Sequence, residues 1–237
     1  MSIGLSLIIP VLNERELLPE LIRQIEALNP DETIIVDGGS DDGSLEWLQE
    51  HWHGHSDSYT LLSATTGRAS QMNAGAQAAQ NSVLLFLHAD TQLPINAKEL
   101  ILSASSSASL EKFWGRFDVR FESHKKRRSM GVIAYFINLR SRVSNIATGD
   151  QAIFVSRSLF DQVRGFEEIE IMEDVAFSKK LRRIARPLCL HATVTSSARR
   201  WEHNGVMATV IQMWVYRLAF VLGVAPARLK RGYRNVR

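Results

Sequence analysis

The chain has 237 residues, a mass of 26.7 kDa and 45% apolar residues, which suits one large folded domain and excludes wholesale disorder. Its single cysteine, Cys189, excludes a protein built on internal disulfides and a cysteine-rich zinc module. The net charge of +3 hides an asymmetry, since residues 1–100 carry 4 Lys/Arg and 14 Asp/Glu, whereas the remainder carries 24 and 11. An acidic half suits metal or hydroxyl ligation, and a basic half suits phosphates or an anionic surface.

The first hundred residues alternate expected strands and helices. Apolar runs predict strands at residues 5–10, 33–36, 59–63 and 83–87. Helices are expected between them, up to residue 28, at 44–51 and at 69–80, and Asn13 can cap the first. This βαβ rhythm predicts parallel strands joined by right-handed crossovers.

The second half is less regular. Strands are expected at residues 113–121, 152–155 and 188–194, and helices at 158–163, 175–184 and 205–223. A serine-rich segment at 103–109 predicts a helix end and a loop, and a basic run at 124–128 precedes an apolar stretch. We expect a domain at residues 1–203, with a nucleotide-binding half (1–100) and an acceptor half (101–203). An apolar helix and a basic tail follow at 204–237.

Polar clusters follow three of the expected strands, at residues 10–14, 37–43 and 88–90. Ligands of parallel sheets bind where strands end at their carboxyl edge, so this coincidence predicts a site there. Asp37 can accept bonds from a ribose or a base, and Gly39 lets the backbone approach a ligand, although a plain polar turn is the alternative. The glycine spacing is not GxGxxG, so a nicotinamide site is not expected.

Two further segments bring charged groups to this edge. Arg68 lies at an expected helix start, where a guanidinium and free N–H groups suit an anion, and Asn73 can add hydrogen bonds. An ordinary surface helix start is the alternative. Asp90 is a natural ligand for a divalent ion that bridges a diphosphate. His88 can ligate the metal, contact a phosphate or act only as a structural hydrogen-bonding group.

Paired acids, Glu173 and Asp174, open a later expected helix. They suit a general base that deprotonates a hydroxyl, although the helix dipole alone also favours acids at this position. Asp150 is a third acid, before a strand. Arg200 and Trp201 can hold a diphosphate and pack against an acceptor, or can form only a basic surface loop.

Taken together, these motifs resemble glycosyltransferase family 2, the inverting nucleotide-sugar transferases with the GT-A fold, over residues 3–201. The matching motifs are PVLNE at 10–14, VDGGSDDG at 36–43, His88-Ala89-Asp90 in the place of DxD, and Glu173-Asp174 in the place of the acidic catalytic pair. Residues 67–75 and 87–91 are similar to a compact bacterial subgroup, often named for similarity to carotenoid-acid glycosyltransferases.

The resemblance implies an α/β GT-A fold with a Rossmann-like, mostly parallel sheet flanked by helices and followed by a C-terminal apolar helix. It implies the inverting transfer of one sugar from a nucleoside-diphosphate sugar, with a UDP-sugar favoured, to a hydroxyl or carboxyl acceptor that can be lipid-like. A nucleotidyltransferase and a non-catalytic nucleotide-sugar-binding protein are the alternatives. No nucleic-acid partner is expected.

The resemblance also implies roles for individual residues. Asp174, with Glu173 beside it, would be the base, and Asp90 would hold Mn²⁺ or Mg²⁺, with His88 as the second candidate ligand that the residues themselves offer. The nucleotide would contact Pro10, Asn13, Glu14, Asp37, Gly39, Arg68 and Asn73. From the residues themselves, we expect the acceptor or the diphosphate to contact Asp150, Arg200 and Trp201. The sequence departs from the family pattern in two places. His88 stands in place of the first Asp of DxD. Ser197 stands in place of the Gln of processive members, and this second departure favours the transfer of one sugar per acceptor.

The expected helix at 205–223 is more apolar than one core-facing stripe requires. Gln212 and Arg217 make spanning unfavourable, so we expect a membrane-interface helix, a homodimer contact, or packing on its own domain. Five Lys/Arg in the last ten residues suit an anionic leaflet. No signal peptide is expected, because the chain start lacks a basic segment. The expected location is therefore the cytoplasm, with peripheral attachment to the inner face of the cell membrane.

Overall fold

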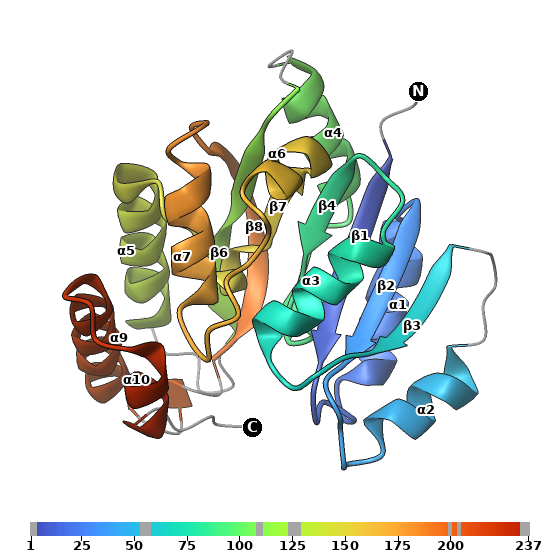
Figure 1. Cartoon of the computed structure of the whole chain (residues 1–237), viewed down its shortest axis with the longest axis horizontal. Coiled ribbons are helices and arrows are strands. Elements are labelled where there is room, and N and C mark those ends of the chain that lie inside the picture. The colour runs from blue at the N-terminus through green and yellow to red at the C-terminus, as the bar shows by residue number, and fades with distance from the viewer. Residues whose placement is uncertain are drawn as a thin grey trace.

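A single mixed sheet with helices on both faces forms the core of the computed structural model, which describes residues 4–52, 58–107, 111–122, 129–198, 201–202 and 205–232 (Figure 1). The eight strands follow the order β3-β2-β1-β4-β7-β6-β8-β5. The strands are β1 (Leu5–Val11), β2 (Glu32–Asp37), β3 (Tyr59–Ser63), β4 (Val83–Phe86), β5 (Thr91–Gln92), β6 (Trp114–Glu122), β7 (Ile153–Ser156) and β8 (Leu188–Ser197). The helices are α1 (Leu18–Leu28), α2 (Ser44–His51), α3 (Arg68–Ala78), α4 (Ala97–Ser107), α5 (Ser129–Ser144), α6 (Arg157–Gln162), α7 (Glu173–Leu181), α9 (Val206–Val221) and α10 (Pro226–Gly232).

The four N-terminal strands are parallel, as the βαβ rhythm predicts, with β1 between β2 and β4 and with β3 beyond β2. Side chains along β1 alternate between the faces of the sheet. Leu7 and Ile9 pack into one core cluster and Ile8 packs into the other, and all three are fully buried. Helices therefore cover both faces here, which explains the continuous apolar run in the sequence.

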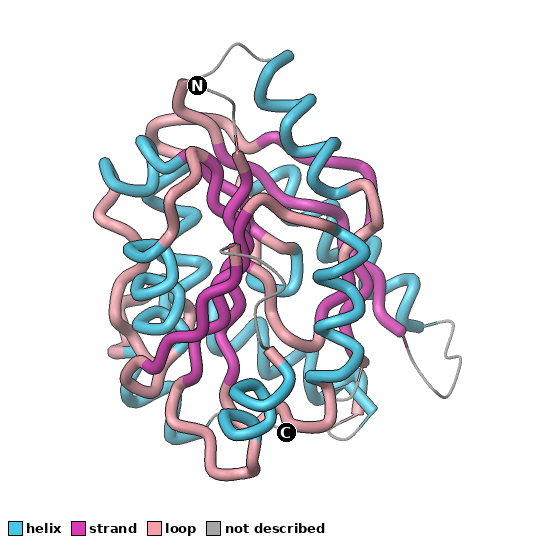
Figure 2. The backbone as a smooth tube through the Cα atoms, turned by 90° about the vertical axis from the view of Figure 1, so that its right-hand side faces the viewer, coloured by secondary structure: helices cyan, strands magenta, loops and turns pink. Residues whose placement is uncertain are grey.

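Each face of the sheet has its own helices. Leu21 of α1, Leu48 of α2 and Ile101 of α4 belong to one core cluster. Met72 of α3 and Phe177 of α7 belong to the cluster on the opposite face. Figure 2 shows the strands crossing the middle of the molecule with helices to either side, and this layering confirms the expected α/β class.

The second half of the sheet is mixed. β7 runs antiparallel to β4 and β6, while β8 runs parallel to β6 and antiparallel to β5. The helix end expected in the serine-rich segment at 103–109 is found there, since α4 ends at Ser107, while the expected loop at 108–109 lies outside the described residues. Its Ser105 is buried, and the hydroxyl donates to the carbonyl of Leu102 at 2.9 Å, so the helix itself satisfies this polar group.

A third, smaller cluster joins the C-terminal helices to the sheet. Met130 and Ile133 of α5 pack with Trp201, and Val206 and Val210 of α9 pack against them. α9 lies where the sequence predicts an apolar helix, and α5 and α9 are neighbours in Figure 1. In the described part of the chain, no helix combines the length and hydropathy needed to cross a bilayer.

Candidate active site at the carboxyl edge of the sheet

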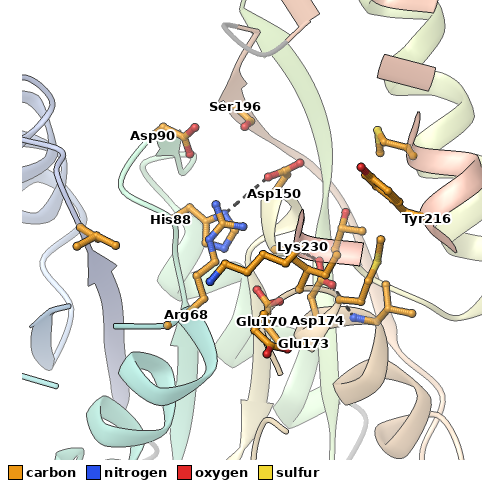
Figure 3. Close-up of a pocket in the computed structure, with 18 of the residues that line it drawn as sticks. Arg68, His88, Asp90, Asp150, Glu170, Glu173, Asp174, Ser196, Tyr216 and Lys230 are labelled. Atoms are coloured by element: carbon orange, nitrogen blue, oxygen red, sulfur yellow. Dashed lines mark hydrogen bonds and ion pairs between the residues drawn. The ribbon is translucent and has the colours of Figure 1, made fainter. Parts of the chain in front are cut away.

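One pocket opens at the carboxyl ends of the parallel strands and collects side chains from both halves of the chain (Figure 3). Eight of the residues that the sequence nominates line it: Glu14, Arg68, His88, Asp90, Asp150, Glu173, Asp174 and Trp201. Five nominated residues do not line it: Pro10, Asn13, Asp37, Gly39 and Asn73. Arg200 lies outside the described residues.

The loops after β1 and β2 are joined to each other by hydrogen bonds. The Asp37 carboxylate accepts the N–H groups of Gly39 and Ser40 at 2.8 and 3.1 Å, and the Ser40 hydroxyl at 2.6 Å. Asn13 accepts the N–H of Asp41 at 2.9 Å through its side-chain oxygen. These two side chains therefore shape the loops beside the pocket.

Asn13 does not cap the first helix, so that expectation is wrong. Its φ of 55° places it in the left-handed region, which asparagine tolerates, and its side chain is used by the neighbouring loop. α1 begins five residues later, at Leu18, and its N-cap residue Leu17 makes no side-chain capping bond.

Helix α3 begins at the pocket. Arg68 is its first residue and is exposed at the rim, as the sequence predicts. One turn further, the buried Gln71 donates to the carbonyls of Val11 and Val36 at 2.7 and 2.8 Å, which ties the ends of β1 and β2 together. A Cβ on Gly38 would lie 2.8 Å from the Gln71 side chain, so this close approach explains that glycine.

Asn73, on the same helix, is occupied elsewhere. Its amide donates to the carbonyl of Phe166 at 3.0 Å, and its oxygen accepts the Phe166 N–H at 2.9 Å. These paired bonds hold the segment that leads to α7, so Asn73 acts here as a fold-stabilising residue. The sequence could not separate this role from nucleotide binding.

His88 and Asp150 meet inside the pocket. The Nδ1 atom of His88 lies 3.7 Å from Oδ1 of Asp150, and the histidine side chain is 12% exposed. A Cβ on Gly149 would lie 2.2 Å from the His88 ring, so glycine is needed for the ring to pack there. His88 and Asp150 are 62 positions apart in the sequence, and the fold brings them together.

Glu173 and Asp174 form the first turn of α7, at the floor of the pocket (Figure 3). Asp174 accepts the N–H of Gly149 at 2.9 Å and the N–H of Val175 at 2.6 Å. It therefore bridges α7 to the loop before β7 rather than only capping its own helix. Glu173 is 6% exposed, so this pair sits in a much less polar environment than water.

Burial controls the proton affinity of this pair. Burial raises the pKa of Glu173, and the charge of Asp174 raises it further, while Arg68 opposes both effects. Burial also raises the pKa of Asp174; the N–H bonds from Gly149 and Val175 lower it, and the charge of Asp150 raises it. A carboxylate with a raised pKa is a stronger base than one in water, as a general base requires.

Glu173→Gln is expected to stabilise the fold increasingly as the pH rises. Because the folded-state pKa of Glu173 is raised, the folded chain holds a proton that the unfolded chain loses, so wild-type stability falls as pH rises through this window. Glutamine does not titrate. Tm of the variant and of wild type is measured from about pH 4, near the ordinary carboxyl pKa, to about pH 8. The Tm of the variant should equal that of wild type at the low end and exceed it increasingly as the pH rises. A difference that is constant across this range, or one matched by the exposed control Glu168→Gln, would contradict the burial of a charge at Glu173.

The C-terminal helices supply a wall of the pocket that the sequence did not predict. Met213, Tyr216 and Arg217 of α9 and Lys230 of α10 line it. The spacing of the three α9 residues puts them on one helix face, but the sequence alone does not say what that face contacts. Trp201 also lines the pocket while packing against Phe121 at a ring distance of 5.6 Å, so it belongs to the core as well.

The polar groups of the pocket fit a divalent ion that arrives with a diphosphate. The described residues contain no group of three His, Cys, Asp or Glu side chains arranged to hold a metal alone. Asp90 and Asp150 nevertheless both line the pocket, with His88 beside Asp150. Mg²⁺ and similar hard ions are commonly held by one or two carboxylates plus substrate phosphates, and this donor set matches that pattern.

The model of the family described as "Glycosyl transferase family 2" matches residues 6–164, about two thirds of the chain. The chain belongs to this family. The match contains Arg68, His88, Asp90 and Asp150, whereas the pair Glu173 and Asp174 and the C-terminal helices lie beyond its end. The family expected from the sequence motifs is therefore confirmed.

Curated relatives of this family 2 member match over a shorter stretch. An undecaprenyl-phosphate 4-deoxy-4-formamido-L-arabinose transferase of Pseudomonas savastanoi pv. phaseolicola is 38% identical over 96 residues, 38% of this chain and 28% of that protein. The transferase of the same name from Pectobacterium atrosepticum is 39% identical over 98 residues, 38% of this chain and 30% of that protein. The match thus spans under a third of these relatives' length.

Solved structures share the fold over most of the chain. A mannosyltransferase from Pyrobaculum calidifontis, in complex with GDP-Man and Mn²⁺, superposes with a TM-score of 0.67 at 19% identity, covering 96% of this chain and 67% of that one. S. aureus TarS in complex with UDP-GlcNAc gives a TM-score of 0.64 at 16% identity, covering 82% and 58%. These similarities confirm the expected GT-A fold.

Proposed function

We propose that this family 2 member is an inverting glycosyltransferase that moves one sugar from a nucleoside-diphosphate sugar to a hydroxyl of a lipid-like acceptor. The observation that carries the proposal is the acid pair, a buried Glu173 and a partly buried Asp174, which opens on the same pocket as Arg68 and Asp90. The GDP-Man and UDP-GlcNAc bound by the structural neighbours support the donor class, and the lipid-phosphate named in the curated relatives supports the acceptor class.

The proposed reaction is a single displacement at the anomeric carbon. The acceptor oxygen attacks this carbon from the face opposite the diphosphate, the bond to the diphosphate oxygen breaks, and the configuration inverts. Asp174, whose pKa burial raises, takes the acceptor proton, and Glu173 beside it supports this base. Arg68 stabilises charge on the departing diphosphate, and the pocket holds both reactants in line. When bound, Mn²⁺ or Mg²⁺ held by Asp90 with His88 would supply further positive charge to the diphosphate.

A screen of nucleotides by thermal unfolding tests this proposal. In the presence of Mn²⁺, one of UDP, GDP, CDP and dTDP should raise Tm more than the others, because selective binding stabilises the folded state. We favour UDP. A nucleotidyltransferase would instead be stabilised most by a nucleoside triphosphate, and a non-catalytic binding protein would bind a nucleotide sugar without ever releasing its sugar.

Asp90→Asn is expected to keep the fold and to remove the Mn²⁺-dependent part of nucleoside-diphosphate affinity. Among the described residues, its carboxylate accepts a hydrogen bond from the Thr91 hydroxyl at 3.4 Å and from no other side chain, so the substitution disturbs little else. Calorimetric titration of the nucleotide selected above, with and without Mn²⁺, measures the effect, and His88→Ala should lose less. If wild type and Asp90→Asn show the same gain in affinity from Mn²⁺, Asp90 does not hold the ion. The matched control is Asp161→Asn, which replaces an exposed carboxylate and should behave as wild type.

We also propose that the enzyme attaches peripherally to the inner face of the cell membrane. Apart from Ile95 and Ile184, every large apolar side chain that is exposed in the described residues lies on α5, on α9 or in the turn after α9. We call this set the two-helix surface: Val132, Tyr135, Phe136, Leu139, Val143, Met207, Ile211, Trp214, Val215, Leu218, Val221, Leu222 and Val224.

The two-helix surface has the properties of an interfacial membrane contact. Its members recur every three or four residues, so each helix presents one continuous apolar stripe, and the opposite sides of both helices pack in the third core cluster. Trp214 and Tyr135 are residue types favoured at membrane interfaces. In the sequence, the basic run at 124–128 precedes α5 and the basic tail follows α9, which favours an anionic leaflet over a second copy of the chain.

A further inference from the structure

The C-terminal helices are folded back onto the pocket rather than extending away from it. The chain turns after α9 at Gly223, whose φ of 85° favours glycine, and the Val224 N–H donates to the carbonyl of Ala219 at 2.9 Å. The α10 helix then begins at Pro226, and its Leu229 is buried. Two contacts therefore fix the course of the chain up to the residue after Leu229.

That residue is Lys230, which lines the pocket with Arg68 and His88. In Figure 3 its side chain extends across the pocket, and its amine points toward these two residues. Among the described residues, none forms a hydrogen bond or an ion pair with the Lys230 amine. From sequence alone, Lys230 is one of five basic residues of a tail that is expected to face a membrane leaflet. The structure instead places it in the pocket.

An ammonium group that points into a pocket, with no partner in the described part of the chain, suits an anion. Lysine is a compact point charge that commonly binds phosphate oxygens, and Arg68 lies on the other side of the same space. Arg228, on the same helix, is exposed and does not line the pocket. Lys230 therefore differs from Arg228 in its position at the pocket and not in its charge. The family match ends at residue 164, so this cation comes from outside the matched region.

We propose that Lys230 and Arg68 together bind a phosphate group in this pocket. The inference rests on the proposed function, which offers two sources of that group: the diphosphate of the donor and a phosphate on a lipid-like acceptor. It makes α10 part of the binding site. Since α9 carries both pocket residues and part of the two-helix surface, this helix would connect the membrane contact with substrate binding.

Substitutions on α10 test this inference in the full-length protein. Three variants are compared with wild type: Lys230→Gln, the conservative Lys230→Arg, and the control Arg228→Gln. The phosphate ligands are UDP, GDP, CDP and dTDP, each against its nucleoside, and farnesyl phosphate against farnesol, all titrated by calorimetry. Lys230→Gln should bind at least one phosphate ligand about 10-fold or more weakly, the effect of losing one charged hydrogen bond. The nucleosides and farnesol should bind as they do to wild type.

The outcomes separate the two phosphate sources and the two proposals. A loss confined to nucleoside diphosphates assigns Lys230 to the donor, and a loss confined to farnesyl phosphate assigns it to the acceptor. Lys230→Arg should retain most of the affinity, and Arg228→Gln should match wild type. If Lys230→Gln binds every phosphate ligand as tightly as wild type, the inference is wrong and the proposed function stands. If wild type binds no phosphate ligand, both are wrong.

Discussion

Asp174→Asn should lower turnover by about 10²-fold or more, the usual scale for losing a general base, while donor affinity stays within a few-fold. Asparagine keeps the size of the side chain and can still accept one of the two N–H bonds that Asp174 receives from Gly149 and Val175. It cannot take the proton of an acceptor hydroxyl. Turnover is measured with the donor selected by thermal unfolding, and donor affinity by calorimetry.

The controls for this variant also test the division of roles in the acid pair. Asp161→Asn, an exposed carboxylate of α6, should leave turnover unchanged. If Glu173→Gln is inactive while Asp174→Asn is active, the roles are reversed; if both are active, the pair is only a helix cap. An acceptor whose attacking oxygen is already ionised needs no base, so a small effect with farnesyl phosphate beside a large effect with an alcohol would show that Asp174 acts by deprotonating the acceptor hydroxyl.

The pH dependence supplies a second readout of the same base. Because burial raises the pKa of Asp174, the acidic limb of the turnover profile should lie above the ordinary range of a carboxyl group. Asp150→Asn should move this limb to lower pH, since the charge of Asp150 contributes to raising the pKa of Asp174. A limb that stays in place in Asp150→Asn would show that another group controls the profile.

Replacing Trp214 and Leu218 together by Glu is expected to lower partitioning onto anionic vesicles by about 10²-fold or more, since burying each such side chain contributes about 1.5–3 kcal/mol. Both residues belong to the two-helix surface, at 67% and 60% exposure, so the substitutions disturb little of the core. Sedimentation with anionic and with neutral vesicles at low salt measures the effect. Tyr135→Glu on α5 should weaken binding in the same direction.

A matched control comes from the exposed apolar residues outside this surface. Ile95→Glu replaces a side chain that is 75% exposed and should leave vesicle binding unchanged. If the wild-type protein does not prefer anionic vesicles, the membrane proposal is wrong. If wild type is a dimer in solution and the double substitution makes it a monomer, the two-helix surface is a contact between two copies instead.

The sequence predicted those parts of the molecule that depend on local pattern. The strands β1 to β4 are apolar runs with turn residues between them, and the polar clusters at their ends could be placed at one edge by topology alone. That reasoning brought Arg68, His88 and Asp90 to one pocket. The sequence also predicted that the acid pair opens α7, because the start of a helix can be recognised from its residue pattern.

Other features depend on which groups become neighbours only in the fold. Asp37 and Asn73 match family motifs, yet their side chains bond to nearby backbone, a use that no motif distinguishes from ligand binding. The sequence is compatible with burial of the apolar residues of α5 in the core, and only the structure shows that several of them are exposed. Lys230 could be assigned to the pocket only once the turn at Gly223 had been placed, since charge and position in the sequence suggest a leaflet instead.

Release of nucleoside diphosphate from nucleotide sugars tests the central claim most directly. A panel of UDP-, GDP-, CDP- and dTDP-sugars is incubated with Mn²⁺ and with farnesol in anionic vesicles, and wild type is compared with Asp174→Asn. Wild type should release the diphosphate of one class of donor and form a product of inverted anomeric configuration, while Asp174→Asn stays near the rate without enzyme. Release that is equal in wild type and Asp174→Asn, or a folded wild type that cleaves none of these donors, would contradict the account.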